Sequence, residues 1–466
     1  MDGRGGEPTL LRRRVLLNVL GIEKSIVRKQ RRLRLHPHHH KTLDIRLPPR
    51  MRHFRLRSRL GCLATPPLRP NSSSRPSSPL QRPSVITKLT TNIQPRSTPT
   101  ATFATMVQVT QLKVAVLDDY QGIAEPHFNK LDRSLFDFTV FNDTLLPYNH
   151  PETPRYAQDA LVSRLEPFHV ICTMRERTPF PKELIDRLPN LKLLLTTGLR
   201  NASLALPVFA ERGIPVAGTA DKSTGTQVGT NSTTEHCVTL ILALARNIAA
   251  DDLAVKSGLW QTDLATGLTA KTLGVIGLGR LGVSTAKIMH LAFGMKVIAW
   301  STNLTQEAAD DKARAEGLPV EGPDGEKTFK VVGRKELFSA ADVVSVHLVL
   351  SDRSRGLINA EDLSKMKKTA LFVNTSRGPL VVEEDLLGVL KKGGIRGCAV
   401  DVFNLEPLPA DSEWRTTEWG RDGRSKVLLT PHMGYVEEKT LNAWYEQQAD
   451  NIKRWQAGDV LLNVLA

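Results

Sequence analysis

Short apolar runs alternate with longer helix-like segments along most of the chain. A first group of strand-like runs covers residues 113–117, 169–173, 191–196 and 214–217. A second group covers residues 273–276, 296–300, 342–347, 370–374, 396–400 and 427–429. Short apolar runs separated by helical segments are typical of parallel strands that are buried on both faces. The pattern therefore predicts an α/β protein with two doubly wound parallel sheets.

Two long helices are expected besides those between the strands. Asn231-Ser232-Thr233-Thr234 offers N-cap chemistry for an apolar helix that reaches about Asn247. A second helix is expected over residues 437–458. Residues 106–466 are too many for one hydrophobic core, so we expect two domains.

A glycine pattern stands between a strand and a helix. Gly277, Gly279 and Gly282 follow the run 273–276 and precede a helix-like run over 283–293. At such a turn the backbone can approach a pyrophosphate closely, and the helix N-terminus presents N–H groups to it. The alternative is a glycine turn that only lets a helix pack on a strand. The context favours a dinucleotide site.

Three polar residues of complementary chemistry each follow a predicted strand. They are Arg377, Glu406 and His432. A histidine beside a carboxylate can act as an acid near neutral pH, and an arginine can hold a carboxylate with a planar fork of donors. Each residue alone has a structural explanation as a surface or turn residue. Together, at one edge of an open sheet, they favour a site for an anionic substrate.

From about Val107 to its C-terminus, the chain resembles the D-isomer-specific 2-hydroxyacid dehydrogenases. The motifs that carry this resemblance are the glycine pattern, Asp342-Val343-Val344-Ser345-Val346-His347, Asn374-Thr375-Ser376-Arg377-Gly378, Asp401-Val402-Phe403 with Glu406-Pro407, and Thr430-Pro431-His432. The resemblance implies a Rossmann-like cofactor domain, residues 229–435, inserted into a substrate-binding domain made of residues 106–228 and 436–466.

The resemblance also implies roles for individual residues. Arg377, Glu406 and His432 match the family's catalytic residues. The matching cofactor-binding positions are Gly277, Gly279, Arg280, Leu281, Gly282, Ser301, Leu348, Thr375, Ser376 and Asp401. The matching substrate-binding positions are Arg175, Gly198, Leu199 and Arg200. For Arg175 the alternative is a surface pair with Arg177 that brackets Glu176.

The implied activity is NAD(P)-dependent reduction of a 2-oxo acid to a D-2-hydroxy acid, as in glyoxylate and hydroxypyruvate reductases. The alternative is an NAD(H)-sensing, corepressor-like binding protein of the same fold. Family analogy also implies a homodimer.

The choice between NAD and NADP stays open in the sequence. A carboxylate is expected after the second strand of a dinucleotide-binding unit, where it holds the ribose hydroxyls. Here that strand is followed by Ser301-Thr302-Asn303, and the next basic residue is Lys312. Two further departures, residues 319–330 and 411–425, are expected to be surface-loop insertions, the second of which could shape access to the substrate site.

The net charge of +15 comes from the N-terminal region. Residues 1–105 hold 22 Lys and Arg but 4 Asp and Glu, whereas the rest of the chain holds 41 basic and 44 acidic residues. We expect this leader to be disordered. It could precede a true start at Met106, serve as a mitochondrial transit segment in an otherwise cytoplasmic protein, or bind nucleic acid. We expect no nucleic-acid partner for the folded part.

The cysteines, the clustered histidines and the lengths of the apolar runs indicate no further functional site. Cys62, Cys172, Cys237 and Cys398 are far apart in the sequence, which favours a reduced intracellular protein, and the last three lie in apolar runs. We expect no metal site, because the histidines at positions 36–40 lack accompanying ligands. No apolar run approaches the length of a membrane span, so we expect a soluble protein.

Overall fold

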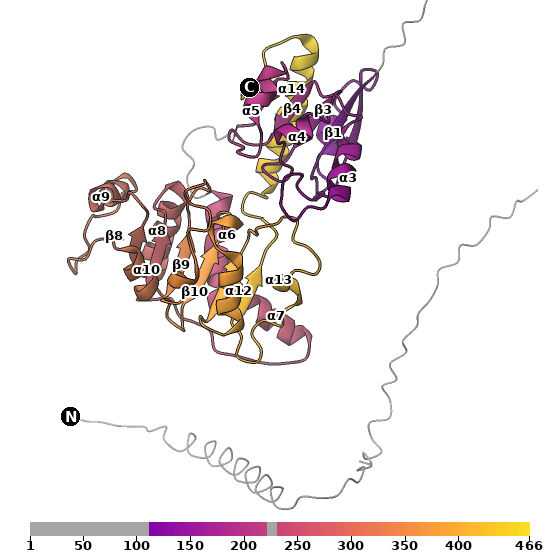
Figure 1. The fold of residues 1–466 in the computed structure, drawn as a ribbon. Coiled ribbons are helices and arrows are strands. Elements are labelled where there is room, and N and C mark those ends of the chain that lie inside the picture. Colours follow the sequence, from indigo (N-terminus) through magenta and orange to yellow (C-terminus); the bar gives the residue numbers. More distant parts are fainter. Residues whose placement is uncertain (1–110, 221–230) are drawn as a thin grey trace, which may run out of the picture. The chain divides into compact units, whose positions relative to one another are not determined.

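The computed structural model describes residues 111–220 and 231–466. The expectations for the leader, and the predicted domain boundary at residues 228 and 229, fall outside these ranges. The described residues form two sheets, both entirely parallel, with helices on both faces (Figure 1). Both sheets belong to one unit of the chain, Ala101–Ala466. The predicted fold class is confirmed.

The first sheet has five strands in the order β2-β1-β3-β4-β5. Its strands are β1 (Leu112–Val116), β2 (Phe136–Val140), β3 (Val170–Thr173), β4 (Leu193–Thr196) and β5 (Val216–Ala217). Its helices are α2 (Glu125–Phe128), α3 (Arg155–Leu165), α4 (Lys182–Ile185), α5 (Leu206–Glu211) and α14 (Glu438–Ala457). The C-terminal segment also reaches this sheet, because Ala217 and Val464 form an antiparallel bridge.

The second sheet has seven strands in the order β12-β11-β10-β9-β6-β7-β8. Its strands are β6 (Thr272–Ile276), β7 (Lys296–Trp300), β8 (Lys330–Val331), β9 (Val343–Val346), β10 (Leu371–Asn374), β11 (Gly397–Val400) and β12 (Lys426–Leu429). Its helices are α6 (Ser232–Ala245), α7 (Ile248–Lys256), α8 (Arg280–Phe293), α9 (Gln306–Ala315), α10 (Arg334–Ala340), α11 (Ala360–Leu363), α12 (Glu383–Lys391) and α13 (Glu413–Thr416), with the 3-10 helix η1 (Gly378–Leu380).

Successive side chains of each strand enter different cores. In β3, Ile171 joins a core with α3, α4 and α5, whereas Val170 and Cys172 join a core with α2 and α14. In the second sheet, Val373 packs with α6 and α8, whereas Phe372 packs with α10 and α12. Because strand side chains alternate between faces, continuous apolar strands require cover on both sides, which the helices supply.

Several local predictions are confirmed. Asn231 caps α6, and its side chain accepts a hydrogen bond from the Thr234 N–H. Cys172, Cys237 and Cys398 are buried free thiols, and burial raises the pKa of each. Within residues 111–220 and 231–466, no helix is long and apolar enough to cross a membrane.

Some elements escaped sequence analysis. All ten predicted strands are present, but β2 and β8 were missed. β2 is an edge strand with mixed polarity, and β8 has two residues. Residues 411–425 are more than a surface loop: Trp414 is 3% exposed and packs in the core of the second sheet, where it contacts Phe403. The burial of Trp414 fixes this segment to the core. The polar residues around Trp414 gave no sign of that burial in the sequence.

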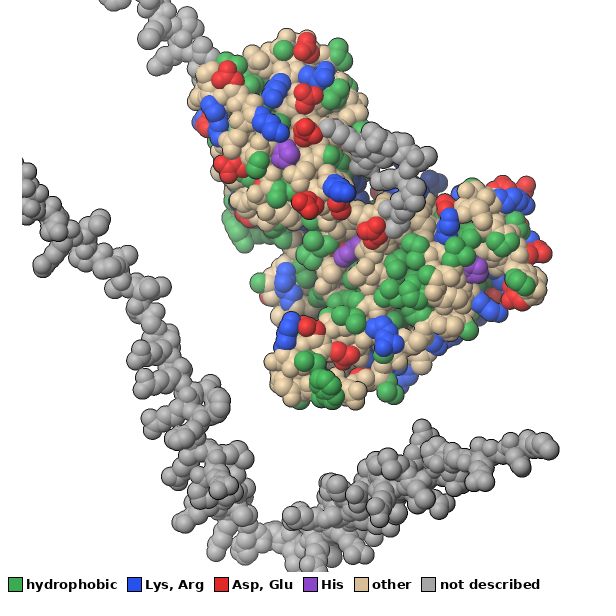
Figure 2. Space-filling view, turned by 180° about the vertical axis from the view of Figure 1, so that it is seen from behind, with side chains coloured by type: hydrophobic (Ala, Val, Ile, Leu, Met, Phe, Trp, Pro, Cys, Tyr) green, Lys and Arg blue, Asp and Glu red, His purple; other side chains and the backbone are tan. Residues whose placement is uncertain are grey.

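Charges of both signs are interspersed on the face shown in Figure 2. Blue lysine and arginine side chains lie among red aspartate and glutamate side chains, as the near balance of charge in this part of the sequence suggests. Among the described residues on this face, lysines and arginines form no continuous basic region.

Candidate functional site

The predicted catalytic residues follow three neighbouring strands of the second sheet. Arg377 follows β10, Glu406 follows β11, and His432 follows β12. Parallel strands put their carboxyl ends at one edge of the sheet, which is where ligands bind in open α/β sheets. Gly378 brings the first two loops together: a Cβ at this position would lie 2.1 Å from the Phe403 carbonyl carbon, so only glycine fits.

His432 and Glu406 form a direct pair. The His432 Nδ1 lies 2.6 Å from the Glu406 Oε2, and the other Glu406 oxygen accepts a hydrogen bond from the Phe403 N–H. Burial raises the pKa of Glu406, but the charge and hydrogen bond of His432, with smaller contributions from Phe403 and Arg177, outweigh it and lower that pKa. The carboxylate therefore stays ionised beside the ring. Because Glu406 occupies Nδ1, Nε2 is the ring nitrogen left for a substrate.

Asp401 fixes the loop that carries His432. Its carboxylate accepts hydrogen bonds from the backbone N–H groups of Met433 and Gly434 and from the Thr430 hydroxyl. The same carboxylate lies 3.1 Å from the His236 Nε2. The Asp401 carbonyl accepts the His432 N–H at 2.7 Å. Burial raises the pKa of Asp401, but these partners outweigh it and lower the pKa. His432 itself has a φ of 55°, a left-handed conformation that this network stabilises.

Arg377 has part of its guanidinium engaged. Nη1 donates to the Ser376 carbonyl at 2.7 Å, and Nη2 donates to the Glu176 Oε1 at 3.1 Å. Its side chain is 33% exposed. The Asn374 side chain donates to the Arg377 carbonyl and fixes the turn. The guanidinium can therefore meet an anion while Glu176 holds one of its ends.

The glycine loop has the shape that a dinucleotide needs. A Cβ at Gly282 would lie 2.2 Å from the Gly277 carbonyl oxygen, and one at Gly277 would lie 2.8 Å from the His347 carbonyl oxygen. At Gly279, the N-cap of α8, an added Cβ would meet nothing within 4 Å. The first and third glycines therefore permit close packing, and the second leaves open space beside the N-terminus of α8. This loop fits a pyrophosphate.

The other predicted cofactor residues surround this loop or the strand ends beside it. Leu348 lies next to Gly277, and Arg280 begins α8 with an exposed side chain. The Ser376 hydroxyl donates to the Val346 carbonyl at 2.7 Å. Ser301 directly follows β7. Contacts of Leu281, Thr375 and Asp401 with a cofactor stay predictions.

Part of the predicted substrate-binding set lies together. A Cβ at Gly198 would lie 2.0 Å from the Arg175 Nη1, so the guanidinium rests directly on this glycine. The Gly198 N–H is already bonded to the Thr219 hydroxyl. Leu199 and Arg200 are exposed, and their N–H groups have no partner among the described residues. These last two positions are the part of the loop that is available to an anion.

Sequence analysis missed a partly buried group of residues that reaches His432 from the first sheet. The Arg177 Nε donates to the Tyr435 hydroxyl at 2.5 Å, and its Nη2 donates to the His432 carbonyl at 3.3 Å. Asp118, 2% exposed, follows β1 and accepts hydrogen bonds from Thr144 and Thr178. Burial raises the pKa of Asp118 to about 6, although Thr144, Arg177 and other partners oppose the shift. The signal that could have revealed Asp118 in the sequence was the position of an acidic residue directly after a predicted strand.

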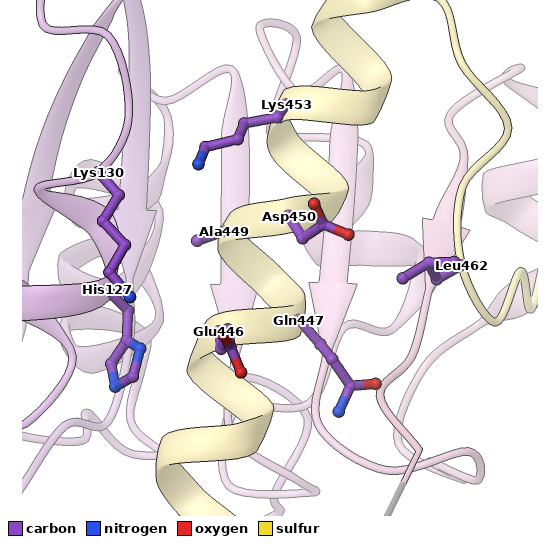
Figure 3. A pocket seen from close by; sticks show the side chains of 8 residues that line it. All are labelled: His127, Lys130, Glu446, Gln447, Ala449, Asp450, Lys453 and Leu462. Atoms are coloured by element: carbon purple, nitrogen blue, oxygen red, sulfur yellow. The ribbon is translucent and has the colours of Figure 1, made fainter. Parts of the chain in front are cut away.

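A cavity of about 250 Å³ lies elsewhere in the described part of the chain. Its lining comes from α2, α14 and the segments after them: His127, Lys130, Glu446, Gln447, Ala449, Asp450, Lys453 and Leu462 (Figure 3). None of these residues belongs to the predicted site, and their charges are mixed. No group of three or more His, Cys, Asp or Glu within the described ranges could hold a metal ion.

The sequence and fold match known proteins. Residues 238–434 match the family model described as "D-isomer specific 2-hydroxyacid dehydrogenase, NAD binding domain". A hydroxypyruvate reductase of Thermotoga maritima is 34% identical over 57% of this chain and 77% of its own length. A D-3-phosphoglycerate dehydrogenase of Synechocystis sp. is 31% identical over 60% of this chain but 46% of its own length. The crystal structure of a phosphoglycerate oxidoreductase of Vibrio cholerae superposes with a TM-score of 0.60 at 31% identity, covering 75% of this chain and all of that chain.

Proposed function

Because the chain belongs to the D-isomer-specific 2-hydroxyacid dehydrogenase family, and is therefore an NAD-dependent oxidoreductase, we propose that it reduces a 2-oxo acid to the D-2-hydroxy acid. His432 is the acid, Glu406 supports it, and Arg377 binds the substrate. The observation that carries this proposal is the half-buried His432–Glu406 pair at the strand edge that also bears Arg377.

His432 supplies the proton. As the carbonyl carbon accepts hydride, its oxygen gains negative charge and takes a proton from the His432 Nε2. The Glu406 carboxylate, held on Nδ1, orients the ring and stabilises the cation before the proton leaves. The substrate gains one hydride at carbon and one proton at oxygen, and His432 recovers its proton from solvent. The same groups act in reverse during oxidation of the hydroxy acid.

Arg377 holds the substrate. Its guanidinium can donate to the substrate carboxylate or carbonyl through the nitrogens that Glu176 and Ser376 leave free. Arg175 and the exposed N–H groups of Leu199 and Arg200 are further carboxylate donors. Arg177 is a positioning residue, because it holds the His432 carbonyl and the Tyr435 hydroxyl together.

The cofactor is NAD(H), held by the glycine loop, and its nicotinamide supplies the hydride when bound. NADPH is accepted as well. Ser301 stands where a carboxylate would repel a 2′-phosphate, and it carries no charge. The Arg334 Cζ lies 5.4 Å from the centre of the Trp300 ring. The Nε and Nη2 of this arginine both donate to Asp362, so they are not free to bind a 2′-phosphate. Discrimination between the two cofactors is therefore weak.

A second copy of the chain covers an apolar region on α7 and the segment after it. The large apolar side chains exposed there are Ile248, Leu253, Val255, Leu259, Trp260 and Leu264. Their exposed fractions run from 54% to 79%, and clustered apolar exposure of this kind is typical of an interface. A homodimer accounts for it, in line with family analogy.

The proposal is tested by following NADH and NADPH oxidation by the full chain with glyoxylate, hydroxypyruvate, pyruvate and branched 2-oxo acids. Wild type is compared with His432→Ala, and NADH binding by both is measured by fluorescence. The proposal is supported if wild type turns over a 2-oxo acid and His432→Ala, while still binding NADH, is at least about 100-fold slower. A folded wild type that binds NADH but turns over no 2-oxo acid contradicts it, and would revive the sensor alternative.

A further inference from the structure

Glu176 stands among the residues proposed to bind substrate. It lies in the loop after β3, between Arg175 and Arg177. Its Oε1 accepts a hydrogen bond from Arg377 at 3.1 Å and is 3.6 Å from the Arg175 guanidinium. The carboxylate therefore bridges the two arginines proposed to contact the substrate, one from each sheet.

The second oxygen of this carboxylate is unused. Glu176 Oε2 is buried and has no hydrogen-bond partner among the described residues, and the side chain is 22% exposed. A buried carboxylate oxygen without a donor is unfavourable, because this oxygen has lost its water while both arginines interact with the other oxygen. A ligand that brings a donor to this oxygen removes that penalty.

The charges around Glu176 also restrict the ligand. Three arginines, Arg175, Arg177 and Arg377, and the His432 cation that acts as the acid stand against three carboxylates in this part of the chain, Glu176, Glu406 and Asp118. This balance leaves about one positive charge for a ligand. A 2-oxo monocarboxylate matches it, whereas a phosphate group adds a charge of about −1.5 to −2 and brings further acceptors toward Glu176.

We propose that Glu176 determines substrate specificity. Its free oxygen accepts a hydrogen bond from a hydroxyl group on the side chain of a 2-oxo monocarboxylate, and its charge disfavours phosphorylated 2-oxo acids. This inference rests on the proposed reductase function. A site built to receive a hydroxyl rejects the analogue that lacks it, because its buried acceptor then stays unpaired.

Hydroxypyruvate and pyruvate provide the test, since they differ by one hydroxyl group, and 3-phosphohydroxypyruvate provides the charged comparison. We expect wild type to prefer hydroxypyruvate over pyruvate by about 10- to 100-fold in kcat/KM, and to use the phosphorylated acid least. In Glu176→Ala the preference should shrink at least about tenfold, through loss of hydroxypyruvate turnover rather than gain with pyruvate. Glu176→Gln keeps an acceptor oxygen without the charge, so it should retain the hydroxyl preference and accept the phosphorylated acid better.

Glu183→Ala, in the exposed first turn of α4, is the control and should match wild type on all three substrates. An unchanged ratio of kcat/KM for hydroxypyruvate to that for pyruvate in an active Glu176→Ala would overturn the specificity role. Equal losses on every substrate would assign Glu176 to positioning Arg377 instead, which also overturns it. Wild type that reduces none of the 2-oxo acids would refute the reductase proposal itself, so the two failures are distinct.

Discussion

Replacing Glu406 with glutamine removes the negative charge beside His432 and keeps the size of the side chain. The amide oxygen can still accept a hydrogen bond from Nδ1, so the change isolates the contribution of charge. Because the ring cation forms the reactive acid, the loss should appear in kcat more than in KM when chemistry limits turnover.

The contact geometry sets the expected size of the effect. Nδ1 and Oε2 are 2.6 Å apart, but both charges are delocalised, so their centres lie roughly 4 Å apart, where the attraction is about 4 kcal/mol at an effective dielectric constant of about 20. The side chains are 16% and 23% exposed, so solvent screens part of this attraction. We therefore expect a loss of about 2 to 3 kcal/mol, which is roughly a 30- to 150-fold fall in kcat.

The assay is stopped-flow NADH oxidation in single turnover with saturating 2-oxo acid. Glu383→Gln is the matched control, since this partly buried glutamate accepts a hydrogen bond from Asn404 in the same loop, without an observed contact to His432. It should stay within about threefold of wild type, as expected of a change away from the reacting groups. A Glu406→Gln rate that also stays within threefold would refute the assignment of charge stabilisation to Glu406.

Three further predictions concern stability, cofactor choice and assembly. The pKa of Asp118 is about 6 in the folded chain, whereas the ordinary value for aspartate is 3.8, so the folded state holds this proton more tightly. The free energy of unfolding therefore falls by about 3 kcal/mol as pH rises between these values. In urea unfolding, the difference in free energy between wild type and Asp118→Asn should change by this amount from pH 3.5 to 7, and a constant difference would argue against a raised pKa. Wild type should use NADH and NADPH with kcat/KM values within about tenfold, and Ser301→Asp should raise the NADH preference about 10- to 100-fold, because a carboxylate repels the 2′-phosphate; an unchanged preference would place the ribose elsewhere. Wild type should sediment as a dimer, and the double variant Trp260→Ser and Leu264→Ser should sediment as a monomer. Wild type that sediments as a monomer would contradict a dimer interface at these residues.

The sequence alone determined the strands that carry the site. Buried parallel strands are apolar on both faces, so β6, β9, β10 and β11 stand out as short apolar runs whatever their neighbours are. The glycine loop was equally readable, because Gly277 needs a positive φ of 98° and its role depends on local backbone shape. Edge strands such as β2 were missed, because mixed polarity there resembles that of a loop.

Only the tertiary structure decided which side chains support the predicted catalytic residues. Arg177 reaches Tyr435 across 258 positions of sequence, and Glu176 reaches Arg377 across 201. Neither pair has a local signal, because a charged residue after a strand looks the same whether it faces solvent or a partner. The chain's packing removes water from these groups, and the loss of water gives Asp118 its raised pKa and leaves Glu176 Oε2 without a donor. Burial and distance in space are properties of the fold, so residue identity and spacing could not reveal them.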